Sequence, residues 1–229
     1  MVIVGKHFEQ YTYGRWFDHE YGEEHTMDII LRLEEEKDYG AVENLTREAF
    51  WNLYKPGCDE HLVIHNMRSA NKFIKELDYV AIHNNEIVGN IVYAKSKIIG
   101  TIKEYEVLTF GPVSVLPMYQ KRGIGKKLIN HTIKKAKEMK FIAIIIYGNS
   151  KYYERFGFKN TKEYEITDME GNYNNALMVL ELFPGALENI NGRFFEGEIY
   201  KINKEELETF EKRFSYKEKL VLDTQIFKE

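Results

Sequence analysis

The chain has 229 residues, of which 44% are hydrophobic and 14% aromatic, and its formal net charge is −4. A chain of this length and composition can bury a substantial core and form one domain with an appendage. The acidic balance gives no overall attraction to nucleic acid or to an anionic membrane surface, so neither is expected as a partner.

The cysteine content and the hydropathy pattern point to the cytoplasm. Cys58 is the only cysteine, which excludes an intrachain disulfide. The longest apolar run, residues 141–147, is far shorter than the ~20 residues that a membrane helix needs. The first residues lack the charged region, apolar region and cleavage site of a signal peptide. We therefore expect a cytoplasmic protein.

The chain begins irregularly and then becomes periodic. Residues 1–26 are rich in Tyr, His, Glu and Gly without a helical or strand period, and we expect them to form an extension. Residues 29–33 alternate as a strand does. Asp38 is expected to cap a helix that carries Val42 and Leu45 on its apolar face.

A breaker-rich segment, residues 54–61, joins this helix to a second one. His61 and His65 are four residues apart, with Cys58 three residues before His61, and this spacing puts both rings on one side of a helix. No second cluster completes a tetrahedral set, and the order is not H-E-x-x-H. Structural or substrate-wall histidines are therefore favoured, and a metal-binding module is the weaker alternative.

Three strands follow the second helix. Residues 78–83 and 87–99 alternate as strands, and Asn84-Asn85 between them tolerate the positive φ of a tight turn. Residues 105–116 complete an antiparallel meander. Pro112 cannot donate to a strand ladder, so it marks a bulge or an edge within the third strand.

A basic glycine loop comes directly after the third strand. Gly123 and Gly125 allow the backbone to approach an anion, and the start of the following helix has unpaired N–H groups and a positive dipole end. Such a loop binds phosphate. The surrounding cations are Lys121, Arg122, Lys126 and Lys127. Neither the P-loop motif G-x-x-x-x-G-K-[ST] nor the Rossmann motif G-x-G-x-x-G is present.

A helix and a buried strand follow the loop. The apolar residues of the helix recur at intervals of three and four and are Ile124, Leu128, Ile129, Ile133, Ala136 and Met139. The apolar run 141–147 is typical of a strand that is buried on both faces. Strand, helix and strand predict a parallel crossover, with a ligand at the carboxyl ends of the two strands.

The last third of the chain predicts further sheet and one helix. Residues 176–183 read as a buried strand and 194–202 as a strand-like segment. A helix follows Asn203, with Glu206 in the third position of a capping box. Residues 219–227 are expected to form a last strand. The tail is apolar enough to pack on the core or on the second subunit of a homodimer.

Two motifs carry a resemblance to a known family. Gln120-Lys-Arg-Gly-Ile-Gly125, preceded by a V-x-V-x-P strand end, resembles the acetyl-CoA signature Q/R-x-x-G-x-G/A of the GNAT superfamily of N-acetyltransferases. Tyr153-Glu154 and Gly157-Phe158 resemble the family motif Y-E-x-x-G-F. The resemblance covers residues 29–183.

The resemblance implies an α/β GNAT fold. In this fold a mixed central sheet has an antiparallel N-terminal meander, a parallel pair of splayed strands and flanking helices. We accordingly divide the chain into an N-terminal extension (1–26), an acetyltransferase domain (27–183) and a C-terminal extension (184–229). The loop 54–61 would form part of the wall around the acceptor substrate.

The resemblance also implies an activity, namely transfer of acetyl from acetyl-CoA to the primary amine of a small molecule or peptide by direct attack in a ternary complex. Acetyl-CoA is the cosubstrate and no metal is expected. The implied coenzyme-binding residues are Val113, Ser114, Val115, Gln120, Lys121, Arg122, Gly123, Ile124, Gly125, Lys126, Asn149 and Tyr152. A non-catalytic module that binds or senses acyl-CoA is the alternative, because fold does not guarantee chemistry.

The same family assigns a general acid to Tyr153, which would sit beside the coenzyme sulfur and protonate the leaving thiolate. A core aromatic is the other interpretation of this residue. Tyr152 and Ser150 are the alternatives if the short helix is rotated. Glu104 and Glu106, near the start of the bulged strand, are the candidates for the base that deprotonates the amine.

Overall fold

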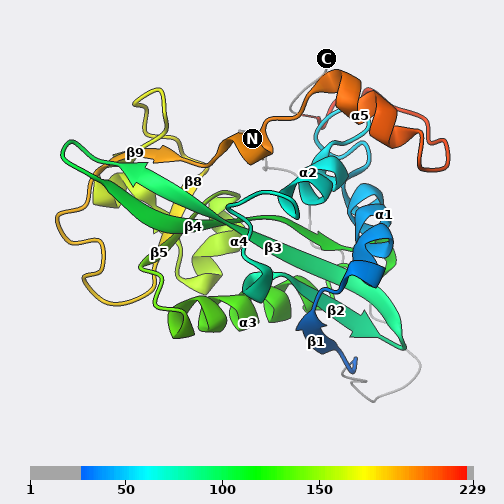
Figure 1. Cartoon of the computed structure of the whole chain (residues 1–229), viewed down its shortest axis with the longest axis horizontal. Helices are drawn as coiled ribbons and strands as arrows, with labels where there is room; N and C mark the ends of the chain where they lie inside the picture. Colours follow the sequence, from blue (N-terminus) through cyan, green and yellow to red (C-terminus); the bar gives the residue numbers. More distant parts are fainter. Residues whose placement is uncertain (1–26, 226–229) are drawn as a thin grey trace.

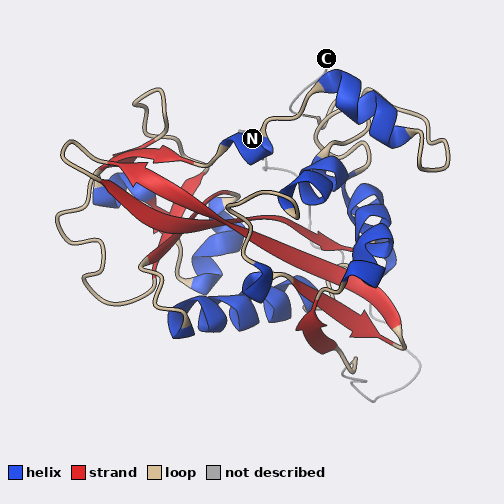
Figure 2. Ribbon diagram, in the orientation of Figure 1, coloured by secondary structure: helices blue, strands red, loops and turns tan. Residues whose placement is uncertain are grey.

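A twisted mixed sheet runs through the molecule, and helices cover both of its faces (Figures 1 and 2). The computed structural model describes residues 27–225. The expected extension 1–26 and residues 226–227 of the expected last strand therefore lie outside the described residues. No helix in the described range is long and apolar enough to cross a bilayer.

The described strands form one sheet in the order β1-β2-β3-β4-β5-β8-β6, and β9 pairs with both β3 and β7. The strands are β1 (Ile30–Leu33), β2 (Tyr79–His83), β3 (Glu86–Ile99), β4 (Glu104–Val115), β5 (Ala143–Tyr147), β6 (Lys159–Asn160), β7 (Ile166–Thr167), β8 (Leu177–Glu181) and β9 (Gly192–Phe195). The α-helices are α1 (Tyr39–Phe50), α2 (Glu60–Met67), α3 (Ile124–Glu138), α4 (Ser150–Tyr153) and α5 (Lys204–Glu211).

The predicted meander is confirmed, since β2, β3 and β4 pair antiparallel in sequence order. Asn84 and Asn85 make the β2–β3 turn with φ of 48° and 64°. Asparagine enters this left-handed region more readily than most residues, because its short polar side chain bonds locally. The predicted crossover is also confirmed, because β4 and β5 run parallel with α3 between them in the chain.

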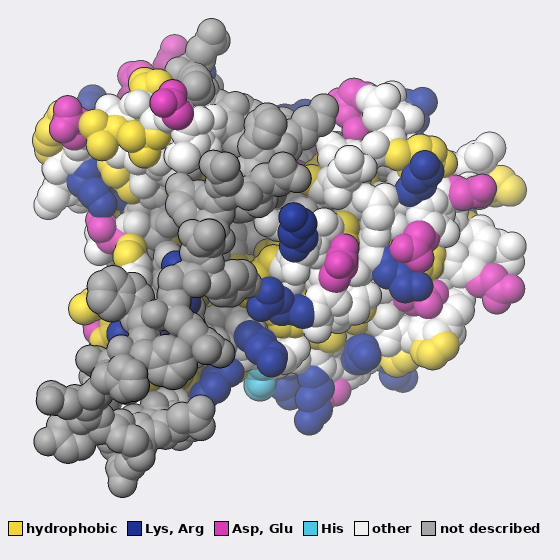
Figure 3. Space-filling model, turned by 180° about the vertical axis from the view of Figure 1, so that it is seen from behind, with side chains coloured by type: hydrophobic (Ala, Val, Ile, Leu, Met, Phe, Trp, Pro, Cys, Tyr) yellow, Lys and Arg dark blue, Asp and Glu magenta, His cyan; other side chains and the backbone are white. Residues whose placement is uncertain are grey.

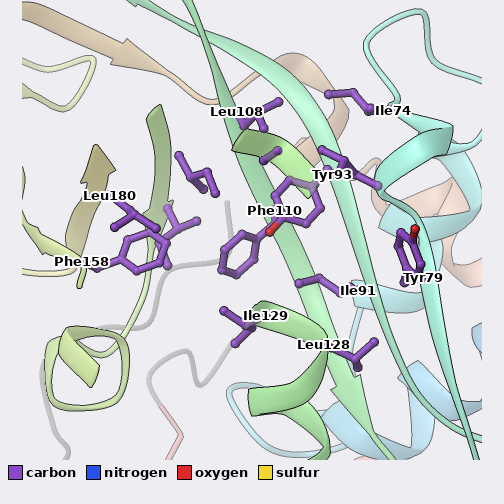
Figure 4. Packing of buried hydrophobic residues seen from close by; sticks show 14 of the residues in the cluster. Ile74, Tyr79, Ile91, Tyr93, Leu108, Phe110, Leu128, Ile129, Phe158 and Leu180 are labelled. Carbon is purple, nitrogen blue, oxygen red and sulfur yellow. The ribbon is translucent and has the colours of Figure 1, made fainter. Parts of the chain in front are cut away.

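Alternate residues of the sheet face two different helix layers. Ile91 and Tyr93 of β3 pack with α3 on one face, whereas Val92 and Ala94 pack with α1 and α2 on the other. This alternation follows from the two-residue repeat of a strand. In the α3 layer, Phe110 of β4 lies between Tyr93 and Phe158 (Figure 4).

The apolar face of α3 was predicted correctly except at two places. Met139 follows the end of the helix and is 37% exposed. Thr132 is fully buried in its stead, with its hydroxyl oxygen 2.9 Å from the Tyr93 hydroxyl. The same hydroxyl donates to the Leu128 carbonyl one turn earlier, which explains how a polar residue fits this face.

The structure confirms only one of the two predicted helix caps. The Asp38 carboxylate does not cap α1; it accepts the backbone N–H of Glu35 and binds Arg32 instead. Asn203 does cap α5, and its side chain accepts the N–H groups of Glu205 and Glu206. The Glu206 carboxylate accepts from Asn66 of α2, so it does not complete a capping box.

Two predicted strands are wrong in whole or in part. The segment 194–202 is a strand only as far as Phe195, because Gly197, at φ 124°, turns the chain into a short 3-10 helix, Glu198–Tyr200. Residues 219–225 are irregular. Their polar groups bond to the α1–α2 loop, for example the Leu220 N–H to Asn52 Oδ1.

Candidate active site

The parallel strands β4 and β5 separate soon after they meet. Within the described residues they pair only where Leu108 lies opposite Ile144. Further along β4, the register with β3 shifts opposite Ile91 and Tyr93, at Gly111-Pro112. The predicted bulge is therefore confirmed. The β4 edge from this bulge to Val115 faces away from β3 and offers backbone groups to an extended ligand.

The glycine loop lies where β4 ends and α3 begins. Lys121 and Gly123 have φ of 62° and 83°, and Gly123 is the residue before the first turn of α3. The Lys127 N–H donates to the Gly123 carbonyl at 3.0 Å. The N–H groups of residues 124–126 precede this bond, so they are the unpaired donors of the helix start. This arrangement suits a phosphate.

The side chains around the loop divide into two groups. Lys121, Arg122 and Lys126 are exposed, and Lys and Arg side chains gather along the lower edge of the molecule, where α3 runs (Figures 1 and 3). The Ile124 side chain is buried in the core. The Gln120 amide donates to the Val115 carbonyl at 3.0 Å, which fastens the loop to the end of β4.

At Ser114, near the end of β4, only the backbone can contact a ligand. The Ser114 hydroxyl is buried and donates to the Thr46 hydroxyl of α1 at 3.0 Å. Val113 and Val115 flank it and pair with Ile91 and Gly89 on the β3 side. Among the described residues, no strand pairs with the opposite edge of Val113 to Val115.

Helix α4 aims two tyrosines at this region. The Asn149 carbonyl accepts the N–H groups of both Tyr152 and Tyr153 at 3.0 Å, which starts the helix. The Tyr152 hydroxyl lies 3.3 Å from the point where a Cβ on Gly125 would stand. Tyr152 therefore reaches the glycine loop, and glycine at 125 keeps the space between them open. Ser150 is the first residue of α4.

Tyr153 lies where β4 and β5 separate. Its ring is 5.9 Å from that of Phe110 on β4 and 5.6 Å from that of Phe158. A Cβ on Gly148, just after β5, would come within 2.4 Å of the Tyr153 ring. Burial raises the pKa of Tyr153 far above the ordinary phenol value, and the neighbouring tyrosines 152, 54 and 93 raise it further. The phenol is therefore neutral and holds its proton.

Glu104 and Glu106 are engaged elsewhere. Glu104 binds Lys97 at 2.6 Å and Glu106 binds Lys95 at 2.9 Å, and both carboxylates are at least half exposed. They precede Leu108 on β4, whereas Phe110 and the separation of the strands come after it. The four residues from 106 to 110 span about 13 Å of strand. The structure does not bring these two carboxylates together with Tyr153.

Residues 75–160 match the model of the acetyltransferase (GNAT) domain. The chain therefore contains a GNAT acetyltransferase domain. The uncharacterized N-acetyltransferase YhbS of Escherichia coli K12 is 21% identical over 72% of this chain and 93% of its own length. YjhQ of the same organism, also an uncharacterized N-acetyltransferase, is 28% identical over 36% of this chain, and the match spans about half of YjhQ, 46%.

Solved GNAT structures share the fold. The E. coli YhbS structure in complex with CoA superposes with a TM-score of 0.69 at 18% identity and covers 80% of this chain and 97% of YhbS. A GNAT acetyltransferase from Brucella melitensis in complex with acetyl-CoA gives a TM-score of 0.61 at 24% identity, over 76% and 99% of the two chains. The GNAT fold predicted from the sequence is therefore confirmed.

The α1–α2 loop and the start of α2 supply two residues that the sequence analysis did not single out. Burial, with a smaller contribution from the Glu60 carboxylate, raises the pKa of Tyr54 to about 12. Glu60 is 6% exposed, and burial raises its pKa to about 7, with a smaller contribution from Asp59. The sequence signal for Glu60 was a carboxylate at the first position of a buried helix, directly before His61.

Cys58, His61 and His65 make structural contacts. The Cys58 sulfur lies 3.5 Å from His61 Nδ1, and His61 Nε2 lies 2.5 Å from the Glu211 carboxylate of α5. His65 turns to Glu43 of α1 at 2.9 Å. Burial lowers the pKa of His61 to about 4, so its ring is neutral. Across residues 27–225, no group of three His, Cys, Asp or Glu could hold a metal ion.

Proposed function

We propose that this GNAT protein is an N-acetyltransferase that moves an acetyl group from acetyl-CoA to a primary amine by direct attack within a ternary complex. The observation that carries the proposal is the neutral Tyr153 phenol beside the point where β4 leaves β5. The open β4 edge and the glycine loop adjoin it. The β4 edge suits the pantetheine of the coenzyme, and the glycine loop suits its pyrophosphate.

The coenzyme would bind through backbone groups. Its pyrophosphate would accept hydrogen bonds from the N–H groups at the start of α3, with Lys121, Arg122 and Lys126 around it. Its pantetheine would lie along Val113 to Val115 as an additional strand. A backbone N–H of β4 would then donate to the thioester oxygen and stabilise the oxyanion that forms. One superposed GNAT structure is a complex with CoA and another is a complex with acetyl-CoA, which supports this binding site.

The reaction would proceed without an acyl-enzyme. A neutral amine attacks the thioester carbon, the C–N bond forms, and the C–S bond then breaks. The leaving thiolate takes the proton of Tyr153, which a phenol with a raised pKa retains until that moment. The proton that the new amide nitrogen loses then restores the phenol. The Cys58 thiol is buried and its pKa is raised well above its usual value, so it would not serve as a nucleophile.

We propose small-molecule amines and peptide amines as acceptors, in a cytoplasmic setting. Release of free CoA thiol from acetyl-CoA, measured with and without a panel of such amines, tests the proposal. Amine-dependent release is expected. If acetyl-CoA binds but no amine causes release of CoA thiol, the proposal is overturned in favour of an acyl-CoA sensing module. If acetyl-CoA does not bind, the proposed coenzyme-binding site is overturned.

A further inference from the structure

Helix α2 begins with a carboxylate that faces inward. Glu60 is the first residue of α2 and is 6% exposed. Val63, Ile64 and Met67 follow at intervals of three, four and seven residues and pack against the sheet with Val92 and Ala94. Residues at these intervals share one helix face. The Glu60 side chain therefore lies on the sheet side of α2.

The Glu60 carboxylate lacks a cation. In the described part of the chain no Lys, Arg or His forms an ion pair with it, and its recorded hydrogen bond comes from the Asp59 N–H at 3.1 Å. The nearby Lys55 binds Asp59 instead. By contrast, the buried Glu34 and Glu43 both bind Arg68 at 2.7 Å. Buried carboxylates are normally paired, and Glu60 is the exception among these three.

The neighbours of Glu60 connect it to the reaction centre. Its charge raises the pKa of Tyr54, and the Tyr54 phenol in turn contributes to the raised pKa of Tyr153. The Tyr54 ring lies 6.1 Å from that of Phe50, the last residue of α1. The Thr46–Ser114 hydrogen bond holds α1 against β4, and α2, which begins with Glu60, contacts β4 as well.

We propose that Glu60 is the general base of this enzyme, which takes the proton from the ammonium group of the acceptor beside Tyr54. The assignment rests on the proposed function. One proton passes from the ammonium to the Glu60 carboxylate, and the neutral amine then attacks the thioester. A second proton passes from Tyr153 to the thiolate, and the proton that the new amide nitrogen then loses restores the Tyr153 phenol. Glu60 gives its proton to solvent.

The chemistry of Glu60 suits this task better than that of Glu104 or Glu106. A base works best when its pKa lies near the working pH, and burial raises the pKa of Glu60 to about 7. The other two carboxylates are half exposed and bound to lysines. The titratable groups that face Glu60 are Asp59, Lys55, Tyr54 and Cys58.

The test compares Glu60→Gln with the matched variants Glu104→Gln and Glu106→Gln. Glutamine has the shape of a protonated glutamate, so the fold should persist. We expect Glu60→Gln to lower kcat/KM for the amine about 100-fold at pH 7, with unchanged acetyl-CoA binding. The deficit should narrow as the pH approaches the pKa of the free amine, because solvent then supplies the neutral form. The two control variants should retain wild-type kcat/KM and pH profiles.

Three results would overturn the assignment. An unchanged kcat/KM and pH profile in Glu60→Gln would reject Glu60 as the base. A deficit of equal size at every pH, together with weakened acetyl-CoA binding, would assign Glu60 a structural role. A wild-type protein that releases no CoA with any amine would reject the proposed function itself, a result visible before any variant is made.

Discussion

The Arg47 guanidinium of α1 donates two hydrogen bonds to the Glu211 carboxylate of α5, with Nε 3.1 Å from Oε1 and Nη2 2.9 Å from Oε2. Arg47 is 3% exposed and also stacks on Trp51. Glu211 meets His61 of α2 as well. One carboxylate thus holds the C-terminal helix against both helices that flank the α1–α2 loop.

Removal of this carboxylate should destabilise the protein. Glu211→Ala leaves the Arg47 charge buried without its partner, which typically costs about 3 kcal/mol or more. Urea unfolding should show the loss as a lower midpoint with an unchanged slope. Glu208→Ala, at an exposed position of the same helix, is the control and should change the free energy of unfolding by less than about 0.5 kcal/mol. Equal shifts in the two variants would contradict this account of the ion pair.

The C-terminal segment also fixes the α1–α2 loop through Asn52. The Asn52 side chain accepts the N–H groups of Gly57 and Leu220 and donates to the Glu218 carbonyl. Its φ of 58° favours Asn or Gly. Asn52→Gly keeps this conformation and removes the three hydrogen bonds.

We expect Asn52→Gly to raise the KM for the amine several-fold, with little change in the KM for acetyl-CoA, because the loop borders the proposed acceptor site and not the glycine loop. Steady-state kinetics with each substrate varied in turn measures the split. Asn189→Gly is the control, since Asn189 has a φ of 61° in an exposed turn outside the site. A parallel rise in both KM values would contradict a local effect on the acceptor wall.

The position of Tyr153 can be tested without changing the residue itself. A Cβ on Gly148 would stand 2.4 Å from the Tyr153 ring, so Gly148→Ala must displace that ring. If Tyr153 is the acid, kcat should fall about 100-fold while acetyl-CoA binding changes little. Gly40→Ala is the matched control, because a Cβ there meets nothing within 4 Å. A Gly148→Ala variant with wild-type kcat would argue against the position assigned to Tyr153.

Replacement of Tyr153 by Phe tests the proton itself. Tyr153→Phe removes only the hydroxyl, so the rings around Phe110 should keep their packing. A general acid contributes 10²-fold or more, and we expect kcat to fall by about that factor at pH 8. Because burial raises the pKa of Tyr153, the wild-type rate should not decline as the pH passes 10 through ionisation of this phenol. Tyr152→Phe, one residue earlier, should retain most of kcat; a full kcat in Tyr153→Phe would remove the residue from the mechanism.

The parts of this site that the sequence predicted are those that local chemistry determines. The turn at Asn84-Asn85, the bulge at Pro112 and the glycine loop at Gly123 each depend on what one residue type permits in its own backbone. The prediction failed where long-range contacts decide. Residues 219–225 have a strand-like composition, but their backbone bonds to Asn52 in a loop and not to a sheet edge. Likewise, the inward direction of Glu60 depends on the packing of α2.

Glu60 and His61 should oppose each other in the pH dependence of stability. The folded pKa of His61 is about 4, below the value of about 6.5 for an unfolded histidine, so this group destabilises the fold as the pH falls from 6.5 to 4. The folded pKa of Glu60 is about 7, above its unfolded value of about 4.5, so its contribution is present below pH 4.5 and is lost as the pH rises to 7.

Between pH 4.5 and 6.5 the two slopes nearly cancel in the wild-type protein. Glu60→Gln removes one of them and leaves that of His61. The free energy of unfolding of this variant should therefore fall on acidification more steeply than that of the wild type, by up to about 1.4 kcal/mol per pH unit. Urea unfolding of both proteins at four pH values in this window measures the difference. Parallel curves would mean that the Glu60 carboxylate titrates normally in the folded protein, which would also weaken its case as a base.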